Sequence, residues 1–251
     1  MENMRTANPA FNDSTFPASS VRTGFREGMT IEGTINRTGI LLLCVLATAA
    51  WTWSQFFTSR EPAVVGPYIL IGALGGFVMA MITVFKKEWA GITAPIYALL
   101  EGLFLGAVSA MLELRFPGIA IQAAALTFGT CICLLLAYRS GLIRATEKFK
   151  LGIVAATGGI ALIYLLSMVL GLFGVQIPYI FGNSPIGILF SVVVVVIAAL
   201  NLILDFNFIE QGALRGAPKY MEWYAAFGLM VTLIWLYLEI VRLLSKLRDR
   251  R

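Results

Sequence analysis

The polar side chains inside apolar stretches are the residues of this sequence best suited to chemistry. Asp205 lies in the segment Asn201-Leu-Ile-Leu-Asp205-Phe-Asn207. Asn201 precedes it by four residues and shares its face of a helix. Their oxygen atoms suit a hard cation or a hydrogen-bonded gate. A carboxylate at membrane depth costs roughly 2.5–3.5 kcal/mol on insertion scales, so Asp205 is a candidate for function.

Glu101 is the second candidate, in the stretch Tyr97-Ala-Leu-Leu-Glu101-Gly-Leu-Phe-Leu-Gly106. It is ten residues into its apolar segment, about 15 Å along a helix and so near mid-membrane. Gly102 and Gly106 allow close helix packing, with the carboxyl group toward the bundle interior. The alternative is a protonated glutamic acid that only donates a hydrogen bond between helices.

Three further glutamates follow Asp205 along the chain. Glu210 and Glu222 are expected at the inner mouth of the bundle, as gate residues or as ordinary solvated loop charges. Glu239 precedes Arg242 by three residues, which favours a plain intrahelical ion pair.

The elements that must position these residues are apolar segments, each about long enough to cross a bilayer. We predict an all-α integral membrane protein, a seven-helix transmembrane bundle with short antiparallel connections. The predicted spans are 39–58, 63–85, 91–114, 117–138, 151–175, 184–208 and 222–244. Residues 1–38 are predicted to be a polar tail, partly disordered, and 39–251 a single membrane domain with a short basic end. Gly72/Gly76 and Gly102/Gly106 predict close helix contacts.

Composition agrees with a membrane protein and argues against an enzyme. Hydrophobic residues make up 59% of the chain and charged residues 13%, against about 25% charged residues in soluble proteins. There is no histidine, and no nucleophile–base pair, phosphate-binding loop or metal-ligand cluster is recognisable. The three cysteines lie in apolar stretches, as small buried residues do. We therefore expect no enzymatic activity, no cofactor, no bound metal centre and no nucleic-acid partner.

Charge predicts the orientation of the bundle. Twelve Lys and Arg residues fall on the side of the N-terminal tail, whereas the first two links on the other side hold only Arg60 and Arg115. The N-terminus is therefore expected in the cytoplasm. If the last segment crosses the membrane completely, five basic residues lie on the other side and break this pattern: Arg242, Lys246, Arg248, Arg250 and Arg251. The charge pattern therefore leaves two alternatives, a complete crossing or a re-entrant segment that returns to the inner face.

Four strings of the sequence resemble the Bax inhibitor-1 (transmembrane Bax inhibitor motif) family, in its bacterial branch. They are Arg5-Thr-Ala-Asn-Pro-Ala-Phe11, the stretch 94–106, Asn201-Leu-Ile-Leu-Asp-Phe-Asn-Phe-Ile-Glu210 and Gly216-Ala-Pro-Lys-Tyr-Met-Glu-Trp-Tyr224. The resemblance implies six helices around a central last helix, in a bacterial cytoplasmic membrane. It also implies a pH-sensitive calcium leak gated by two aspartates that share a proton.

The resemblance assigns Asp205 to the first aspartate of that pair. The second position falls in Leu229-Met-Val-Thr-Leu-Ile-Trp235, at or near Thr232, so one carboxyl group is missing. Glu101 or Glu222 could replace it.

Two functions follow as expectations. The first is a cation leak, with calcium as the ion, in which an ionised carboxylate holds a cation or an ion pair and protonation releases it. The second is a non-transporting regulator that binds another membrane protein, such as a quality-control protease, through its polar tail. A proton-coupled exchanger ranks below both because no internal repeat or interrupted helix pair is evident.

Overall fold

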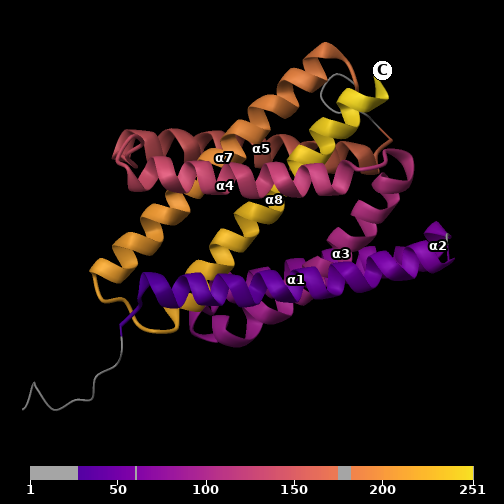
Figure 1. Ribbon diagram of the computed structural model, residues 1–251. Helices are drawn as coiled ribbons and strands as arrows, with labels where there is room; N and C mark the ends of the chain where they lie inside the picture. Colours follow the sequence, from indigo (N-terminus) through magenta and orange to yellow (C-terminus); the bar gives the residue numbers. More distant parts are fainter. Residues whose placement is uncertain (1–27, 60, 175–181, 251) are drawn as a thin grey trace, which may run out of the picture.

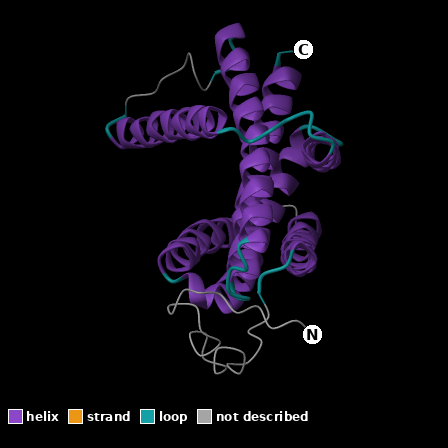
Figure 2. Ribbon diagram, turned by 90° about the vertical axis from the view of Figure 1, so that its left-hand side faces the viewer, coloured by secondary structure: helices purple, strands orange, loops and turns teal. Residues whose placement is uncertain are grey.

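The computed structural model describes residues 28–59, 61–174 and 182–250, and all their regular elements are helical (Figure 2). Seven of these helices are long and apolar enough to cross a membrane. They are α1 (Ile31–Ser59), α2 (Pro62–Phe85), α3 (Ala90–Arg115), α4 (Ile119–Arg139), α5 (Glu147–Leu172), α7 (Pro185–Leu214) and α8 (Met221–Asp249), with a 3-10 turn, η2 (Lys87–Trp89), before α3. The predicted all-α, seven-span architecture is confirmed.

The last helix has the largest buried share of the seven. It packs against α1, α3, α4 and α7. In Figure 1, α7 and α8 run obliquely side by side across the molecule; α1 lies near their lower ends, and α4 and α5 cross their upper parts. Two apolar clusters surround α8: Met230 and Ile234 meet α1 and α3, while Leu233 and Leu236 meet α4 and α7.

Hydrogen bonds at the helix ends determine where the connections between helices stop and the next helix begins. Thr146 accepts a hydrogen bond from the amide of Phe149 at the start of α5, and Ser184 accepts one from Gly187 at the start of α7. Between α3 and α4, Gly118 adopts a left-handed conformation with a φ of 81°. The Glu113 carboxylate accepts the amide of Ala120 at 3.1 Å there and so caps α4.

The predicted polar tail is too long at its C-terminal end, because α1 begins at Ile31. Before that helix the Met29 amide donates to the Ala217 carbonyl at 2.6 Å. The Met29 side chain is buried against Ile209 and Ala225. Tertiary contacts with the α7–α8 connection therefore order this polar stretch. The expected disorder of residues 1–27 lies outside the described residues.

Two predicted loops are also too long. α5 begins at Glu147 inside the expected loop 139–150, and α7 continues to Leu214 inside the expected loop 209–221. The predicted spans were bounded where the apolar residues end, which is where a helix leaves the hydrocarbon. The helical backbone hydrogen bonds continue through polar turns beyond that point, so the helices are longer and the loops shorter than predicted.

The small-residue pairs lie at close helix contacts, as predicted. A Cβ added at Gly72 of α2 would lie 2.7 Å from the Leu100 carbonyl oxygen, and one at Gly106 of α3 would lie 2.7 Å from the Ala49 Cα. Gly102 faces Val45 and Thr48 in the same way. Thr48 also donates a hydrogen bond to the Leu99 carbonyl at 2.9 Å, which joins α1 to α3.

α8 is one continuous helix, so its two ends lie at opposite ends of the bundle. Its end meets the end of α3, where Arg115 forms an ion pair with Asp249 at 2.5 Å. The re-entrant alternative for the last segment is wrong. Three of the basic residues that broke the charge pattern have intramolecular partners: Arg242 pairs with Glu239, Lys246 donates to the Gly187 carbonyl and to Ser191, and Arg248 donates to the Pro117 carbonyl.

Candidate functional site

Asp205 of α7 lies inside the bundle, between α4 and α8. The buried residues around it include Leu202 and Phe206 of α7 and Leu233 of α8. Its Oδ2 atom is inaccessible to solvent and has no hydrogen-bond partner among the described residues. A buried carboxyl oxygen without a partner costs free energy, because water no longer solvates it.

Thr232 of α8 lies next to this carboxyl group. Its hydroxyl also lies 3.3 Å from the Gly228 carbonyl of its own helix, and the residue is 8% exposed. The thiol of Cys131, from α4, interacts electrostatically with Asp205. The site therefore draws on α4, α7 and α8 and contains one carboxyl group.

Asn201 has its amide turned toward α5 rather than Asp205. The amide nitrogen donates to the Thr157 hydroxyl at 2.8 Å and to the Ile197 carbonyl at 2.9 Å. It thus fixes α5 to α7 one helical turn from the Asp205 carboxyl group.

Glu210 lies further along α7, toward the C-terminal end of that helix. It accepts a hydrogen bond from the Tyr138 hydroxyl of α4. Tyr138 also receives a hydrogen bond from the Asn207 amide at 3.2 Å. These three side chains join α4 to α7 about one turn below Asp205.

Glu222 begins α8 and is completely buried, with 0% exposure. Its Oε1 accepts hydrogen bonds from both the amide and the hydroxyl of Thr30 at 2.8 Å. Arg37 of α1 forms an ion pair with Oε2, and Lys219 lies 3.3 Å from Oε1. The interpretation of Glu222 as a solvated loop charge is therefore wrong, because α1 closes over it.

Glu101 belongs to a different interface. Its carboxyl group lies over Gly76 of α2, where an added Cβ would come within 2.8 Å of Oε1. The side chain is half-buried, and none of the described residues hydrogen-bonds it. It lies on the side of α3 that packs on α2, so the structure brings Thr232, and not Glu101, to Asp205.

Glu239 forms a network that sequence reasoning found only in part. The predicted pair with Arg242 is confirmed at 2.9 Å. The Tyr164 hydroxyl of α5 donates to Glu239 at 2.9 Å and accepts from Arg242 at 2.6 Å. The buried glutamate thus joins α8 to α5, a contact between residues 75 apart that no local spacing indicates.

A comparison of the sequence with known families gives one match. The sequence model described as Bax inhibitor 1 like matches residues 8–249, which is nearly the whole chain. The chain belongs to the Bax inhibitor-1-like family. No curated protein and no solved structure matches it.

Thr232 lies at or near the position where the family resemblance predicts a second aspartate. The predicted location of the second aspartate falls beside Asp205 in three dimensions, so this Bax inhibitor-1-like protein has a hydroxyl group where its resemblance led us to expect a second carboxyl group. Glu222 is about 15 Å from Thr232 along α8 by helix rise, and Arg37 neutralises it. Within the described residues, no group of three acidic, cysteine or histidine side chains can hold a metal ion. The arrangement can bind or release a proton, or hold a cation transiently, at a single carboxyl group.

Proposed function

We propose that this Bax inhibitor-1-like protein is a protonation-sensitive cation leak, with calcium as the ion, gated at Asp205. The observation that carries the proposal is the unpartnered Oδ2 of a carboxyl group between α4, α7 and α8. Oxygen is the ligand that calcium prefers. The two buried glutamates of α8 have basic partners, and Glu101 lies at the α2–α3 interface, so Asp205 is the carboxyl group with a buried, unpartnered oxygen inside the bundle.

The direction of gating follows from desolvation. An ionised carboxylate in an apolar site without a partner is costly by several kcal/mol, whereas the neutral acid is tolerated. Ionisation of Asp205 therefore favours a conformation in which water or a cation reaches the carboxyl group. We assign the arrangement described above to the neutral acid and to a non-conducting state, so flux is expected to rise between pH 6 and pH 8.

The test is calcium flux into proteoliposomes that contain the purified full-length protein. We expect Asp205→Asn to remove the pH dependence, because the amide does not ionise. Asp249→Asn is the matched control: the same chemical change at the end of α8, about 25 Å from Thr232 by helix rise, is expected to leave the profile unchanged. Unchanged flux in the combined Asp205→Asn and Glu101→Gln variant contradicts the proposal.

The second candidate is a non-transporting regulator that binds another membrane protein, such as a quality-control protease. The observation in its favour is Thr232 at the position of the expected second carboxyl group. Crosslinking followed by co-purification discriminates between the two functions. Loss of a partner on deletion of residues 1–27, together with no flux in liposomes, favours the regulator. Flux with the pH dependence described above favours the leak.

A further inference from the structure

Asp205 belongs to a row of residues on one face of α7. Ile209 and Gly212 follow it at the i+4 and i+7 positions, the spacing of a single helix face. On α8, Ala225 precedes Thr232 by the same seven residues. The two helices pack against each other, and Ile209 and Ala225 belong to one buried cluster. The two rows therefore face each other, from Asp205 and Thr232 to the ends of the helices that the α7–α8 connection joins.

Met29 lies between these two rows. It precedes α1 in the chain, yet it is only 3% exposed and packs with Ile209 and Ala225. A Cβ added at Gly212 would lie 2.7 Å from its Sδ atom, and Leu229 of α8 packs against the same cluster. The Met29 side chain thus fills the interface between α7 and α8 about two helical turns from the level of Asp205.

The residues on both sides of Met29 are fixed to the start of α8 and to the connection before it. Gly28 forms an antiparallel bridge with Pro218. Thr30 donates its amide and its hydroxyl to Oε1 of the buried Glu222, both at 2.8 Å. These bonds join residues 192 positions apart in the chain. We call residues 28–30 the N-terminal strap, because they tie the beginning of α1 across the end of the α7–α8 pair.

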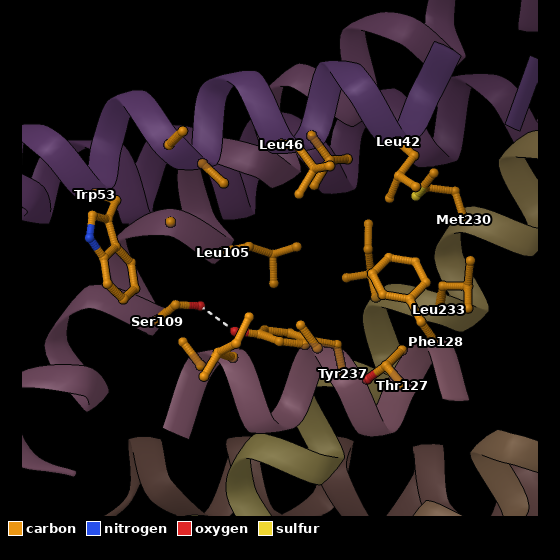
Figure 3. Close-up of a pocket in the computed structure, with 18 residues that line it drawn as sticks. Leu42, Leu46, Trp53, Leu105, Ser109, Thr127, Phe128, Met230, Leu233 and Tyr237 are labelled. Carbon is orange, nitrogen blue, oxygen red and sulfur yellow. Dashed lines mark hydrogen bonds between the residues drawn. The ribbon is translucent and has the colours of Figure 1, made fainter. Parts of the chain in front are cut away.

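An apolar groove on another face of α8 does not reach Asp205. It has a volume of about 480 Å³ and lies between α1 and α4 (Figure 3). Ser109 and Tyr237 in this groove hydrogen-bond each other at 2.6 Å. Neither Asp205 nor Thr232 lines it, and a cation there would lose its hydration without replacement. A route for water and ions to Asp205 is therefore sought on the face of α8 that Met29 covers.

We propose that the N-terminal strap is an intramolecular plug. Met29 closes the route between α7 and α8 to Asp205, and the plug leaves when Thr30 separates from Glu222. This inference rests on the proposed function, because it names the element that keeps water from the Asp205 carboxyl group. The contacts suit a reversible closure. An apolar side chain excludes water, and the hydrogen bonds of the exposed Thr30 can be replaced by bonds to water. Methionine is flexible and unbranched, so it can leave such a gap and return to it.

The test is the rate at which a cysteine behind the plug reacts with a water-soluble reagent. In a background without the three native cysteines, Leu229→Cys places a thiol between Met29 and the level of Asp205. The purified full-length protein in lipid nanodiscs is treated with a trimethylammonium methanethiosulfonate. We expect Met29→Ala to raise the labelling rate about tenfold, because the rate follows the population of the open arrangement and truncation weakens the closure. Met168→Ala, the same change at an exposed residue of α5, should leave the rate unchanged.

A second variant keeps the test decisive if Met29→Ala does not fold, as judged by circular dichroism. Thr30→Val removes a hydrogen bond to Glu222 but keeps Met29, and it is also expected to speed labelling. Thr38→Val is its control, because the Thr38 hydroxyl donates within α1 at 2.9 Å. Unchanged labelling in the folded strap variants overturns the plug. An equal increase at Ile240→Cys, a buried position in the other half of α8, also overturns it, because the whole bundle has then loosened.

Calcium flux through the same variants separates the plug from the proposed function. Faster labelling together with faster flux supports both. Faster labelling without flux in any variant supports the plug and contradicts the leak. Flux that depends on Asp205, with labelling that the strap variants leave unchanged, overturns the plug alone.

Discussion

At the scale of single residues, the structure sorts the intramembrane carboxyl groups by their partners. Glu222 and Glu239 are buried but have basic partners and hydrogen bonds. Asp205 is partly buried, and its inaccessible Oδ2 atom has no hydrogen-bond partner among the described residues. Paired groups hold helices together, because separating the pair leaves a buried charge. An unpartnered group responds most readily to a proton or a cation.

Thr232→Asp restores the carboxyl pair that the family resemblance implies. Two close carboxyl groups cannot both ionise freely, so they titrate as a pair in two macroscopic steps. We expect the pH profile of flux to change from one transition to two, or to a distinctly broader one, measured in the proteoliposome assay. Thr232→Asn, which is similar in size and does not ionise, should keep a single transition. A profile identical to the wild type for Thr232→Asp would show that position 232 does not act with Asp205.

Glu222→Gln tests the buried ion pair at the start of α8. The substitution leaves Arg37 and Lys219 without their carboxylate, and we expect a loss of about 2 kcal/mol, below the 3–5 kcal/mol of fully buried pairs, because both cations are partly exposed. Thermal unfolding in detergent, followed by circular dichroism, measures the loss. Glu88→Gln, on an exposed residue of η2, should unfold at the wild-type temperature. Equal unfolding temperatures for the two variants would contradict a stabilising pair.

At the scale of helices, two kinds of contact join neighbouring helices: close approach at glycine residues, and hydrogen bonds between side chains. α1, α2 and α3 approach closely through Gly72, Gly102 and Gly106. Side-chain hydrogen bonds join α4, α5, α7 and α8, through Tyr138, Asn201 and Tyr164. Packing and hydrogen bonds are the forces available between helices in lipid, where burial of apolar surface gives little.

Gly106→Ala is expected to loosen the contact between α1 and α3. The added methyl group would lie 2.7 Å from the Ala49 Cα, and such overpacking costs about 1–3 kcal/mol. The measurement is again the unfolding temperature in detergent. Gly129→Ala in α4 is the matched control, because its added methyl group meets nothing within 4 Å. A control that destabilises as much as Gly106→Ala would mean that helix flexibility, rather than contact, explains the effect.

At the scale of the whole molecule, α8 connects α1 and α3 to α4, α5 and α7. It contacts four other helices directly and reaches α5 through Glu239 and Tyr164. The basic residues near its end have partners within the chain. In the predicted orientation, these intramolecular contacts would satisfy charges that the positive-inside rule disfavours on the outer side.

The orientation can be tested by cysteine labelling in whole cells. In a background without Cys44, Cys131 and Cys133, we expect Glu61→Cys, at the start of α2, to react with an impermeant maleimide from outside. Arg144→Cys, in the α4–α5 connection, should react only after the membrane is permeabilised, because the lysine- and arginine-rich side faces the cytoplasm. The reverse pattern would invert the predicted topology.

The sequence by itself determined the fold class, the seven spans, the glycine contacts and the Glu239–Arg242 pair, because hydrophobicity and helical spacing are local properties. The family resemblance predicted position 232 for the missing carboxyl group, and this assignment stays a prediction. Only the tertiary structure decided that Glu222 is buried under α1, that Glu101 faces α2, and that Tyr164 joins Glu239. Each of these depends on side chains from helices far apart in the chain, and their rotation and depth are set by packing rather than by spacing along the sequence.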